Sequence, residues 1–287
     1  MELKDFIKQY KSEINALNFK EVYYQASLSL EDRGKLTELF YKLGVDPLKT
    51  LDYIPDYFLL ESSITSFVVP NHIKVIKEGA FFKCSKLKSV TMPAGLTSIE
   101  RYMFFECISL ASIMIPSSVT SIGNGAFHHC RALMHIEIPK SVTSIGESAF
   151  RDCNNLKSAT MKNSVTSIGS RAFMDCSDLT RVVLSNSLVD LAYSLFKNCS
   201  SLTSVTIPDK IKCLSGWVFS GCKSLTNVTI PSSITRIEDY VFEACNNLTK
   251  LTYTGTKEQW ENIYKDRDWE KGSGIKKIAC IDGEINL

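Results

Sequence analysis

The sequence predicts a repeat solenoid, built mainly of short β-strands joined by short helical or irregular arcs. First, phenylalanine, cysteine and leucine recur at a constant interval of 23 residues through most of the chain. Second, each copy ends in a short segment where apolar and polar residues alternate, which is typical of a half-buried strand. Third, the two ends of the chain do not follow this period, as expected for segments that cap a solenoid.

Three columns of residues define the repeat. A cysteine follows each phenylalanine after three residues, and a leucine follows after three more. The eight copies contain Phe81, Phe104, Phe127, Phe150, Phe173, Phe196, Phe219 and Phe242, then Cys84, Cys107, Cys130, Cys153, Cys176, Cys199, Cys222 and Cys245, then Leu87, Leu110, Leu133, Leu156, Leu179, Leu202, Leu225 and Leu248. Self-similarity at a period of about 20–50 residues indicates stacked units, none of which can bury its apolar edge alone.

The copy at residues 115–138 shows how one unit folds. Its last residues, Leu133-x-x-Ile136-x-Ile138, alternate apolar and polar positions and predict a strand. Pro139 ends this strand because proline has no N–H group to continue the ladder. The β-branched segment 119–122 predicts a second short strand. Residues 123–127 then turn the chain, and an irregular arc returns it to Leu133.

The repeated motif resembles the BspA-type leucine-rich repeat family. It reads IPxSVTSIGxxAFxxCxxLxxVxIP at residues 115–139 and 138–162, with looser copies from Ile73 to Tyr253. The resemblance implies a curved, leucine-rich-repeat-like solenoid of the kind found on bacterial and protist surfaces, where it binds host proteins. It also implies a protein without catalytic activity.

The period divides the chain into four parts. We expect a small helical N-terminal cap at residues 1–50 and a degenerate first repeat at 51–72. Eight 23-residue repeats follow at 73–253, and a C-terminal cap of one helix and a β-hairpin occupies 254–287. The copy at 185–196 lacks the usual proline and glycine, so we expect the coils there to bend differently or to make contacts.

The N-terminal cap and the first repeat carry local signals. Phe6, Tyr10, Ile14 and Leu17 recur at helical spacing, and Ser29 is a candidate N-cap for a helix at 30–43.

In the first repeat, Phe58 lies one period before Phe81, which places Glu61 at the cysteine position.

The C-terminal cap begins with a capping box. Thr256 and Gln259 predict a helix that runs through Trp260 and Ile263. Residues 278–285 predict a hairpin whose two-residue turn is Asp282-Gly283.

Composition and the N-terminal residues favour some partners and compartments over others. The 287 residues carry a net charge of +2, which is no electrostatic footprint for nucleic acid. The sequence has no run of about 18 apolar residues, so we predict no membrane insertion. The charged N-terminus does not resemble a secretory signal, so we expect a cytoplasmic protein, with the cell surface or secretion as the alternative.

The cysteine pattern indicates packing rather than a disulfide framework. Eight of the ten cysteines fall on one interior column, where cysteine acts as a small hydrophobe. Buried thiols favour a reducing compartment. Cys213 and Cys280 lie outside the column and are expected to pack locally. Disulfides between neighbouring coils and metal binding are the alternatives.

No catalytic motif is found, so we predict that the protein is not an enzyme and needs no cofactor. The triplet His128-His129-Cys130 has metal-ligand residue types. Because Cys130 belongs to the interior column while its neighbours lie on a turn, we predict that the three do not converge and that no metal is bound.

Two surfaces are candidates for binding. The outward strand residues form one face, expected to be concave, and the turns before each Ala-Phe form another. The non-consensus residues of the first are Met114, His135, Glu137, Arg181 and Lys250, and an aromatic ridge on the second consists of Tyr193, Trp217 and Tyr240. Ordinary variation of a solvated face and packing between turns are the alternative interpretations.

We therefore predict a non-enzymatic protein-binding scaffold whose partner is an unidentified protein. The alternative is a cell-surface adhesin that binds host or matrix proteins, and a third hypothesis is a self-assembling structural rod. The chain itself is expected to be a monomer or a weak homo-oligomer.

Overall fold

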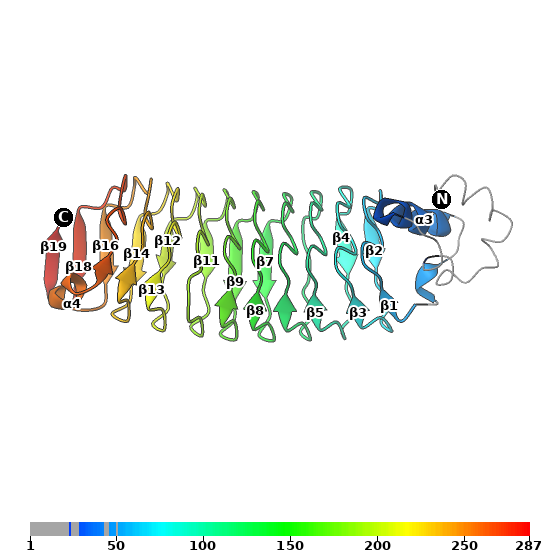
Figure 1. The fold of residues 1–287 in the computed structure, drawn as a ribbon, viewed down its shortest axis with the longest axis horizontal. Coiled ribbons are helices and arrows are strands. Elements are labelled where there is room, and N and C mark those ends of the chain that lie inside the picture. The colour runs from blue at the N-terminus through cyan, green and yellow to red at the C-terminus, as the bar shows by residue number, and fades with distance from the viewer. Residues whose placement is uncertain (1–22, 24–28, 43–45, 50) are drawn as a thin grey trace.

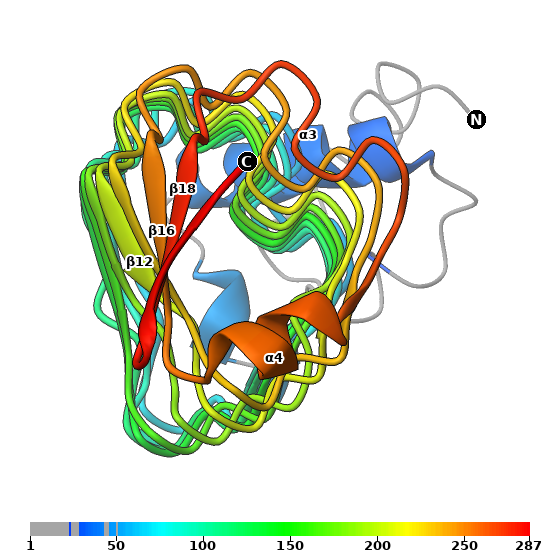
Figure 2. The same cartoon turned by 90° about the vertical axis from the view of Figure 1, so that its left-hand side faces the viewer.

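The protein forms an elongated rod of stacked coils (Figure 1). The computed structural model describes Tyr23 and residues 29–42, 46–49 and 51–287. The fold is a β-solenoid of about ten turns, so the predicted fold class is confirmed. Viewed end-on, the coils superimpose closely, and β12, β16 and β18 lie along one side of the cross-section (Figure 2).

The longer strands form the surface that we call the strand face. Neighbouring coils pair here as parallel strands, and only the last pair, β18 with β19, is antiparallel. Inward and outward side chains alternate, which is why every second residue is apolar. The strands are β2 (Ser66–Val68), β4 (Ser89–Thr91), β7 (His135–Ile138), β9 (Ser158–Met161), β11 (Arg181–Val183), β12 (Ser204–Thr206), β14 (Asn227–Ile230), β16 (Lys250–Tyr253), β18 (Lys277–Cys280) and β19 (Gly283–Asn286).

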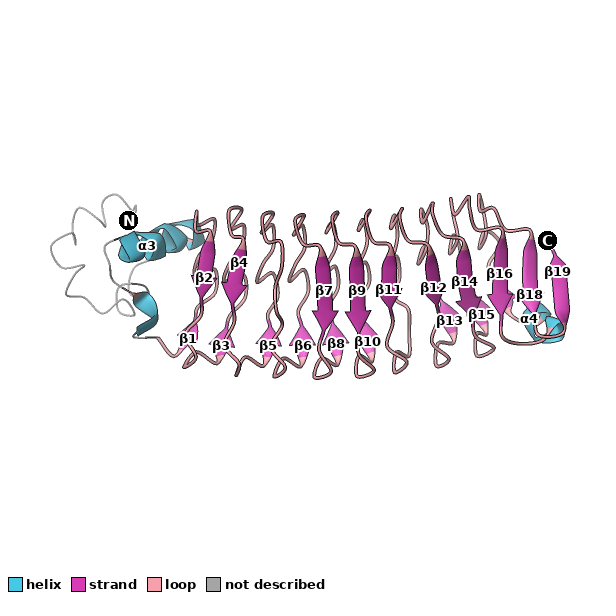
Figure 3. Cartoon of the chain, turned by 180° about the vertical axis from the view of Figure 1, so that it is seen from behind, coloured by secondary structure: helices cyan, strands magenta, loops and turns pink. Residues whose placement is uncertain are grey.

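A second row of very short parallel strands runs along another side of the rod (Figure 3). In the copy at 115–138 it is formed by Ser121–Ile122, within the predicted segment 119–122. The strands are β1 (Tyr53–Ile54), β3 (Val75–Ile76), β5 (Ser98–Ile99), β6 (Ser121–Ile122), β8 (Ser144–Ile145), β10 (Ser167–Ile168), β13 (Cys213–Leu214), β15 (Arg236–Ile237) and β17 (Tyr264–Lys265).

The third side is an irregular segment that we call the turn arc. Its backbone also pairs from coil to coil: the Phe104 N–H donates to the Ala126 carbonyl at 2.8 Å, and the Tyr102 N–H donates to the Asn124 carbonyl at 3.0 Å. Each of the three sides therefore pairs backbone polar groups with neighbouring coils, which reduces the cost of burying them between coils.

Two left-handed residues per coil make this pairing possible, and they form two columns along the rod. Non-glycine members have φ between 53° and 61°, a region that costs an L-residue about 1–2 kcal/mol. The first turn column is Tyr57, Gly79, Tyr102, Gly125, Ser148, Arg171, Ser194, Trp217 and Tyr240; the second turn column is Glu61, Lys83, Glu106, His129, Asp152, Asp175, Asn198, Gly221 and Ala244.

The interior is a stack of phenylalanine rings. All eight rings from Phe81 to Phe242 are fully buried, and neighbouring planes lie within 18° of parallel. Centroids are 5.1 to 5.3 Å apart as far as Phe173 and 5.7 to 5.8 Å apart beyond it. The coils are therefore spaced more widely along this column in the C-terminal half.

The cysteine column runs beside the rings, in the interior position that the sequence predicts. All eight thiols are buried, and each donates to a carbonyl oxygen of the preceding coil, as Cys130 Sγ does to Phe104 at 3.1 Å. All ten cysteines are free thiols in the structure. Burial raises the pKa of Cys84 and Cys245, at the two ends of the column, to about 12, and raises those of the six between them well above the usual value.

The N-terminal end of the rod is covered by α3 (Leu30–Lys42), followed by the 3-10 helix η1 (Pro47–Lys49) (Figure 1). Ser29 caps α3 as predicted, because the Asp32 N–H donates to its hydroxyl at 3.1 Å. The helix predicted around Phe6 to Leu17 lies outside the described residues.

Close packing of α3 on the first coil depends on Gly34. A Cβ atom at this position would lie 2.5 Å from the carbonyl oxygen of Leu60. Leu36 and Phe40, on the same helix, are fully buried. The described helices include none that is long and apolar enough to cross a membrane.

The first coil is shifted by one residue relative to the prediction. Ile54 pairs with Ile76, an offset of 22 residues rather than 23. Leu59, not Phe58, therefore occupies the phenylalanine column, where its carbonyl accepts the Cys84 thiol at 2.8 Å. Glu61 was the expected residue of the cysteine column, but the shift puts Ser62 there, only 2% exposed.

The C-terminal cap consists of α4 (Lys257–Glu261) and the β18–β19 hairpin. Thr256 and Gln259 form the predicted capping box, but the helix ends before Ile263. Trp260 is buried beneath it, with its ring edge-to-face on Tyr253 at 5.2 Å.

The predicted hairpin turn at Asp282-Gly283 is wrong by one residue. Cys280 pairs with Gly283, so the turn is Ile281-Asp282. The reason is a contact that sequence spacing does not reveal: the Asp282 carboxylate accepts the Lys257 N–H at 2.9 Å, at the start of α4. A carboxylate is favoured at a helix N-terminus, and this fixes Asp282 inside the turn.

We expect Phe127→Ala to destabilise the rod by about 3–5 kcal/mol, because it opens a cavity between two stacked rings. Urea unfolding followed by circular dichroism measures the loss. Phe127→Leu, which fills most of the space, should cost less than half as much. Equal losses for the two variants would contradict a tightly packed ring column.

We also expect stability to fall as the pH rises above the unfolded thiol pKa of about 8.5. Below that value both states keep their protons. Above it the unfolded chain releases protons that the buried thiols retain, so unfolding becomes easier by up to about 1.4 kcal/mol per pH unit for each thiol.

Urea midpoints measured between pH 7 and 9.8 test this expectation. Cys153→Ala, which removes one buried thiol, should reduce the slope, whereas Thr206→Ala should leave it unchanged. A flat profile for the natural chain would show that the thiols are not protected from ionisation.

Candidate functional site

The outward residues of the strand face form two columns, and half of their members are serine or threonine. The first, from Ser66 to Lys277, includes His135, Arg181 and Lys250; the second, from Val68 to Ala279, includes Met114 and Glu137. The five predicted residues therefore share one face but not one cluster.

The strand face is interrupted at the coil that carries Met114. Residues 112–114 form no strand, so the ladder breaks between β4 and β7 (Figure 3). Ile113, whose counterparts in most other coils are buried, is only partly buried here. The Met114 side chain is 84% exposed.

An apolar groove of about 300 Å³ accompanies this interruption. No charged side chain lines it. Its lining residues are Val90, Thr91, Met92, Ala94, Met114, Pro116 and Ser117. Val68, two coils before Met114 in the same column, is also 70% exposed.

A second interruption lies between β11 and β12. Only Arg181 and Ser204 pair, whereas β11 pairs with β9 at three positions. The separation opens a cleft of about 570 Å³, lined by Arg181, Asn186, Thr206, Asp209 and Lys210 among others. This cleft adjoins the copy at 185–196, where the sequence predicts altered bending or contacts.

The other strand-face candidates are held by polar neighbours. His135 Nδ1 lies 2.8 Å from the Ser158 hydroxyl. Glu137 pairs with Lys162 at 3.0 Å, and Lys250 pairs with Glu284 of the terminal hairpin at 2.6 Å.

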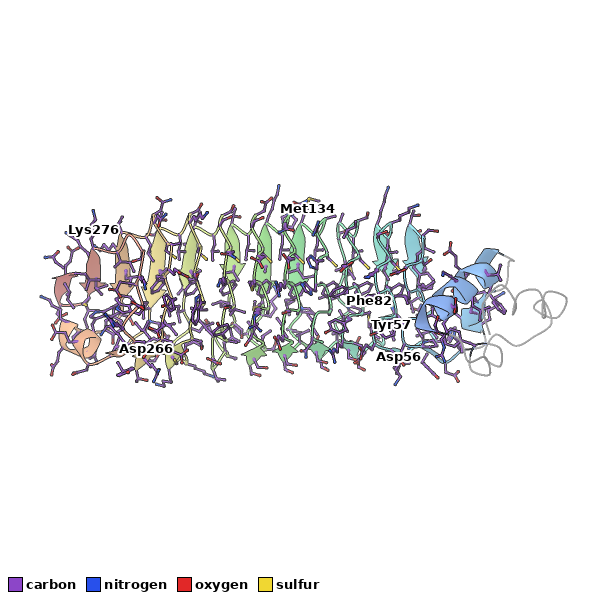
Figure 4. All side chains as sticks on the ribbon, turned by 45° about the horizontal axis from the view of Figure 1, so that its top comes forward. Asp56, Tyr57, Phe82, Met134, Asp266 and Lys276 are labelled. Atoms are coloured by element: carbon purple, nitrogen blue, oxygen red, sulfur yellow. The ribbon has the colours of Figure 1, made fainter. Side chains whose placement is uncertain are left out.

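Met134, labelled in Figure 4, precedes β7 and is 43% exposed.

The aromatic ridge is contiguous on the turn arc. Ring centroids are 5.2 Å apart between Tyr193 and Trp217 and 4.8 Å apart between Trp217 and Tyr240. Each ring also contacts a cation, as Lys197 contacts Trp217 at 5.9 Å. The Tyr240 hydroxyl donates to Asp268 at 3.1 Å. The three rings therefore already have partners within the protein. Of the three, only Tyr193 is exposed, whereas Trp217 and Tyr240 are half-buried.

A second aromatic row on the turn arc escaped the sequence analysis. Tyr57 and Phe82, both labelled in Figure 4, lie 5.6 Å apart, and Phe82 stacks on Phe105 at 4.7 Å. Phe105 in turn forms a T-shaped contact with His128, with ring centroids 5.0 Å apart. The signal was available in the sequence, because Phe82 and Phe105 directly follow Phe81 and Phe104.

The row ends at a polar cluster between two coils. His128 and His129 stack with centroids 4.4 Å apart, and both approach Asp152 of the following coil. Burial lowers the pKa of His128, with smaller contributions from His129 and Arg151, so its imidazole is neutral at pH 7.

These features define a leucine-rich repeat scaffold. Residues 52–180 and 145–266 match the profile of the family described as "BspA type Leucine rich repeat region", in 6 copies. The chain therefore belongs to this family, and the resemblance seen in the sequence is confirmed. Among curated proteins, none matches the chain significantly.

The first two of the following three similar solved structures show the same fold. A leucine rich repeat protein of T. pallidum is 33% identical with a TM-score of 0.53, over 58% of this chain and 79% of the other. A leucine-rich repeat protein of Eubacterium ventriosum is 24% identical with a TM-score of 0.58, over 82% and 67%. A leucine rich cell surface protein of Faecalibacterium prausnitzii is 26% identical with a TM-score of 0.47, over 75% and 80%.

We expect Trp217→Ala to destabilise the protein more than Trp217→Gly does. Both remove the ridge contacts, but Trp217 has φ of 57°, where alanine is strained and glycine is not. The difference should be about 1 kcal/mol in urea unfolding. The usual order, with glycine the less stable variant, would contradict the left-handed turn.

Proposed function

We propose that the protein is a non-enzymatic scaffold that binds a partner protein through its strand face. The observation that carries this proposal is Met114, which is 84% exposed at the rim of an uncharged apolar groove. Exposed apolar patches on folded proteins mark interaction surfaces, and their burial by a partner releases water from apolar surface.

The spacing of the two openings supports a protein-sized partner. Met114 in the groove and Val183 in the cleft occupy the same column three coils apart, a separation of about 14 Å at the usual strand spacing. A partner that fills both openings therefore spans at least three coils of the strand face. A rigid solenoid loses little conformational entropy on binding, which favours such extended contacts.

The partner that fits presents an apolar side chain to the groove and a carboxylate to the cleft. The groove has no charged lining residue, whereas Arg181 and Lys210 line the cleft with only Asp209 to oppose them. The hydroxyl side chains between them, such as Thr160, offer hydrogen bonds without a large desolvation cost. The apolar contact supplies affinity, and the charges supply orientation.

A catalytic role receives no support from these two openings. The groove contains no titratable side chain, and the cleft contains a single acid and no histidine. General acid–base catalysis needs paired groups within reach of one substrate.

We expect Met114→Glu to weaken partner binding at least tenfold, because it places a charge over the apolar groove. A photo-crosslinking residue at position 114 captures the partner, which is then purified and titrated against the intact chain by calorimetry. Arg181→Glu should weaken the same binding by opposing the partner carboxylate.

Val189→Glu is the matched control. Val189 is also apolar and 60% exposed, but it lies away from the strand face, so its variant should bind normally. Thermal melting checks that all variants fold. Undiminished binding of the purified partner to Met114→Glu and Arg181→Glu would remove the strand face as the binding surface.

A further inference from the structure

Three side chains with metal-ligand chemistry meet on the turn arc between two neighbouring coils. They are His128 and His129 from one coil and Asp152 from the next. One ligand atom from each lies within 4.8 Å of the other two. All three residues are half-buried, and Phe105 forms one wall of the cluster.

The distances match the edges of a small coordination sphere. Bonds of 2.0 to 2.2 Å from zinc to nitrogen or oxygen, in a tetrahedron, place neighbouring ligand atoms about 3.4 Å apart. Asp152 Oδ2 lies 3.3 Å from His128 Nε2 and 3.7 Å from His129 Nε2. An ion can therefore enter with small side-chain movements and no change in the coil spacing.

Metal binding requires one of the two histidine rings to change its orientation. They are stacked within 13° of parallel, so one ring has to turn about its Cβ–Cγ bond before both nitrogens face the same ion. His129 Nδ1 is buried and has no hydrogen-bond partner, so no hydrogen bond at this atom holds the ring in its present orientation.

Arg151 lies beside the same carboxylate. Its Nε lies 3.2 Å from Asp152 Oδ2 and 3.8 Å from Asp175 Oδ2, on the following coil. Asp175 is therefore a ready alternative partner for the guanidinium. When an ion binds Asp152, Arg151 can keep an ion pair by moving to Asp175.

We propose that His128, His129 and Asp152 form a binding site for a divalent transition metal of the zinc class, which links two neighbouring coils. Two imidazoles and one carboxylate favour zinc, cobalt or nickel over magnesium and calcium, which prefer oxygen ligands. Three protein ligands leave a fourth position for water.

This site differs from the triplet that the sequence analysis rejected. Cys130 does point inward, where it donates to the Phe104 carbonyl, so it takes no part. The third ligand comes instead from Asp152, which lies 23 residues after His129 in the second turn column. Only the stacking of coils brings these residues together.

Calorimetric titration of the full chain, without a histidine tag and stripped with EDTA, tests the proposal with ZnCl2. We expect one Zn²⁺ per chain with micromolar affinity. Asp152→Asn and His129→Gln should each weaken binding about tenfold or more. Arg151→Gln should tighten it several-fold, because it removes the competing cation.

His135→Gln is the control, because this histidine lies on the strand face and its loss should change nothing. Visible absorption with Co²⁺ reports the coordination number independently, and thermal melting of each variant checks the fold. Absence of saturable Zn²⁺ binding below about 1 mM, or unchanged affinity in both Asp152→Asn and Arg151→Gln, would overturn the site.

Discussion

The structure depends on one constraint: the backbone of each coil forms hydrogen bonds with the next coil in a register that repeats along the rod. On the strand face this register pairs His135 with Ser158 and Ser158 with Arg181, and the turn arc repeats its own backbone bonds from coil to coil. Because the register repeats, like side chains stack on like. The phenylalanine rings and thiols follow from it, and each substitution in a column is felt by the coils on both sides.

The column that contains His135 shows what the register constrains and what it leaves free. Its members in β7, β9 and β11 are a histidine, a serine and an arginine, although their backbones pair in the same way. Backbone pairing fixes the position of each side chain on the face. At an outward position, any residue compatible with a β-strand can be accommodated. The strand face is therefore where the sequence can vary without disturbing the coil.

At both places where pairing between neighbouring coils weakens, the strand face opens. At residues 112–114 the strand is lost, and between β11 and β12 a single residue pair remains. The inward residues Ile113 and Val182 are only partly buried at these positions, unlike Ile136 in a regular coil. Local loss of strand pairing thus accompanies both the apolar groove and the charged cleft, and these two openings differ in charge.

Much of the fold followed from the sequence because a column repeated eight times averages out local ambiguity. The helix caps Ser29 and Thr256 could also be predicted, because a cap depends only on neighbouring residues in the sequence. The one-residue shift that places Leu59 in the phenylalanine column could not be predicted, because it occurs in a single coil and does not repeat. The groove at Met114 depends on lost pairing, which the residue pattern does not encode.

The second turn column explains why a metal-ligand set arises on this rod. Its left-handed backbone favours asparagine, aspartate and histidine among non-glycine residues, so a structural demand brings polar side chains into one line. Asp175 and Asn198 are two such polar residues, and the Asn198 side chain donates a hydrogen bond of 2.8 Å to the Asp175 carboxylate. His129 and Asp152 differ because His128 adds a second imidazole beside them. The left-handed backbone explains why polar residues occupy the second turn column, but it does not explain His128, which lies outside that column.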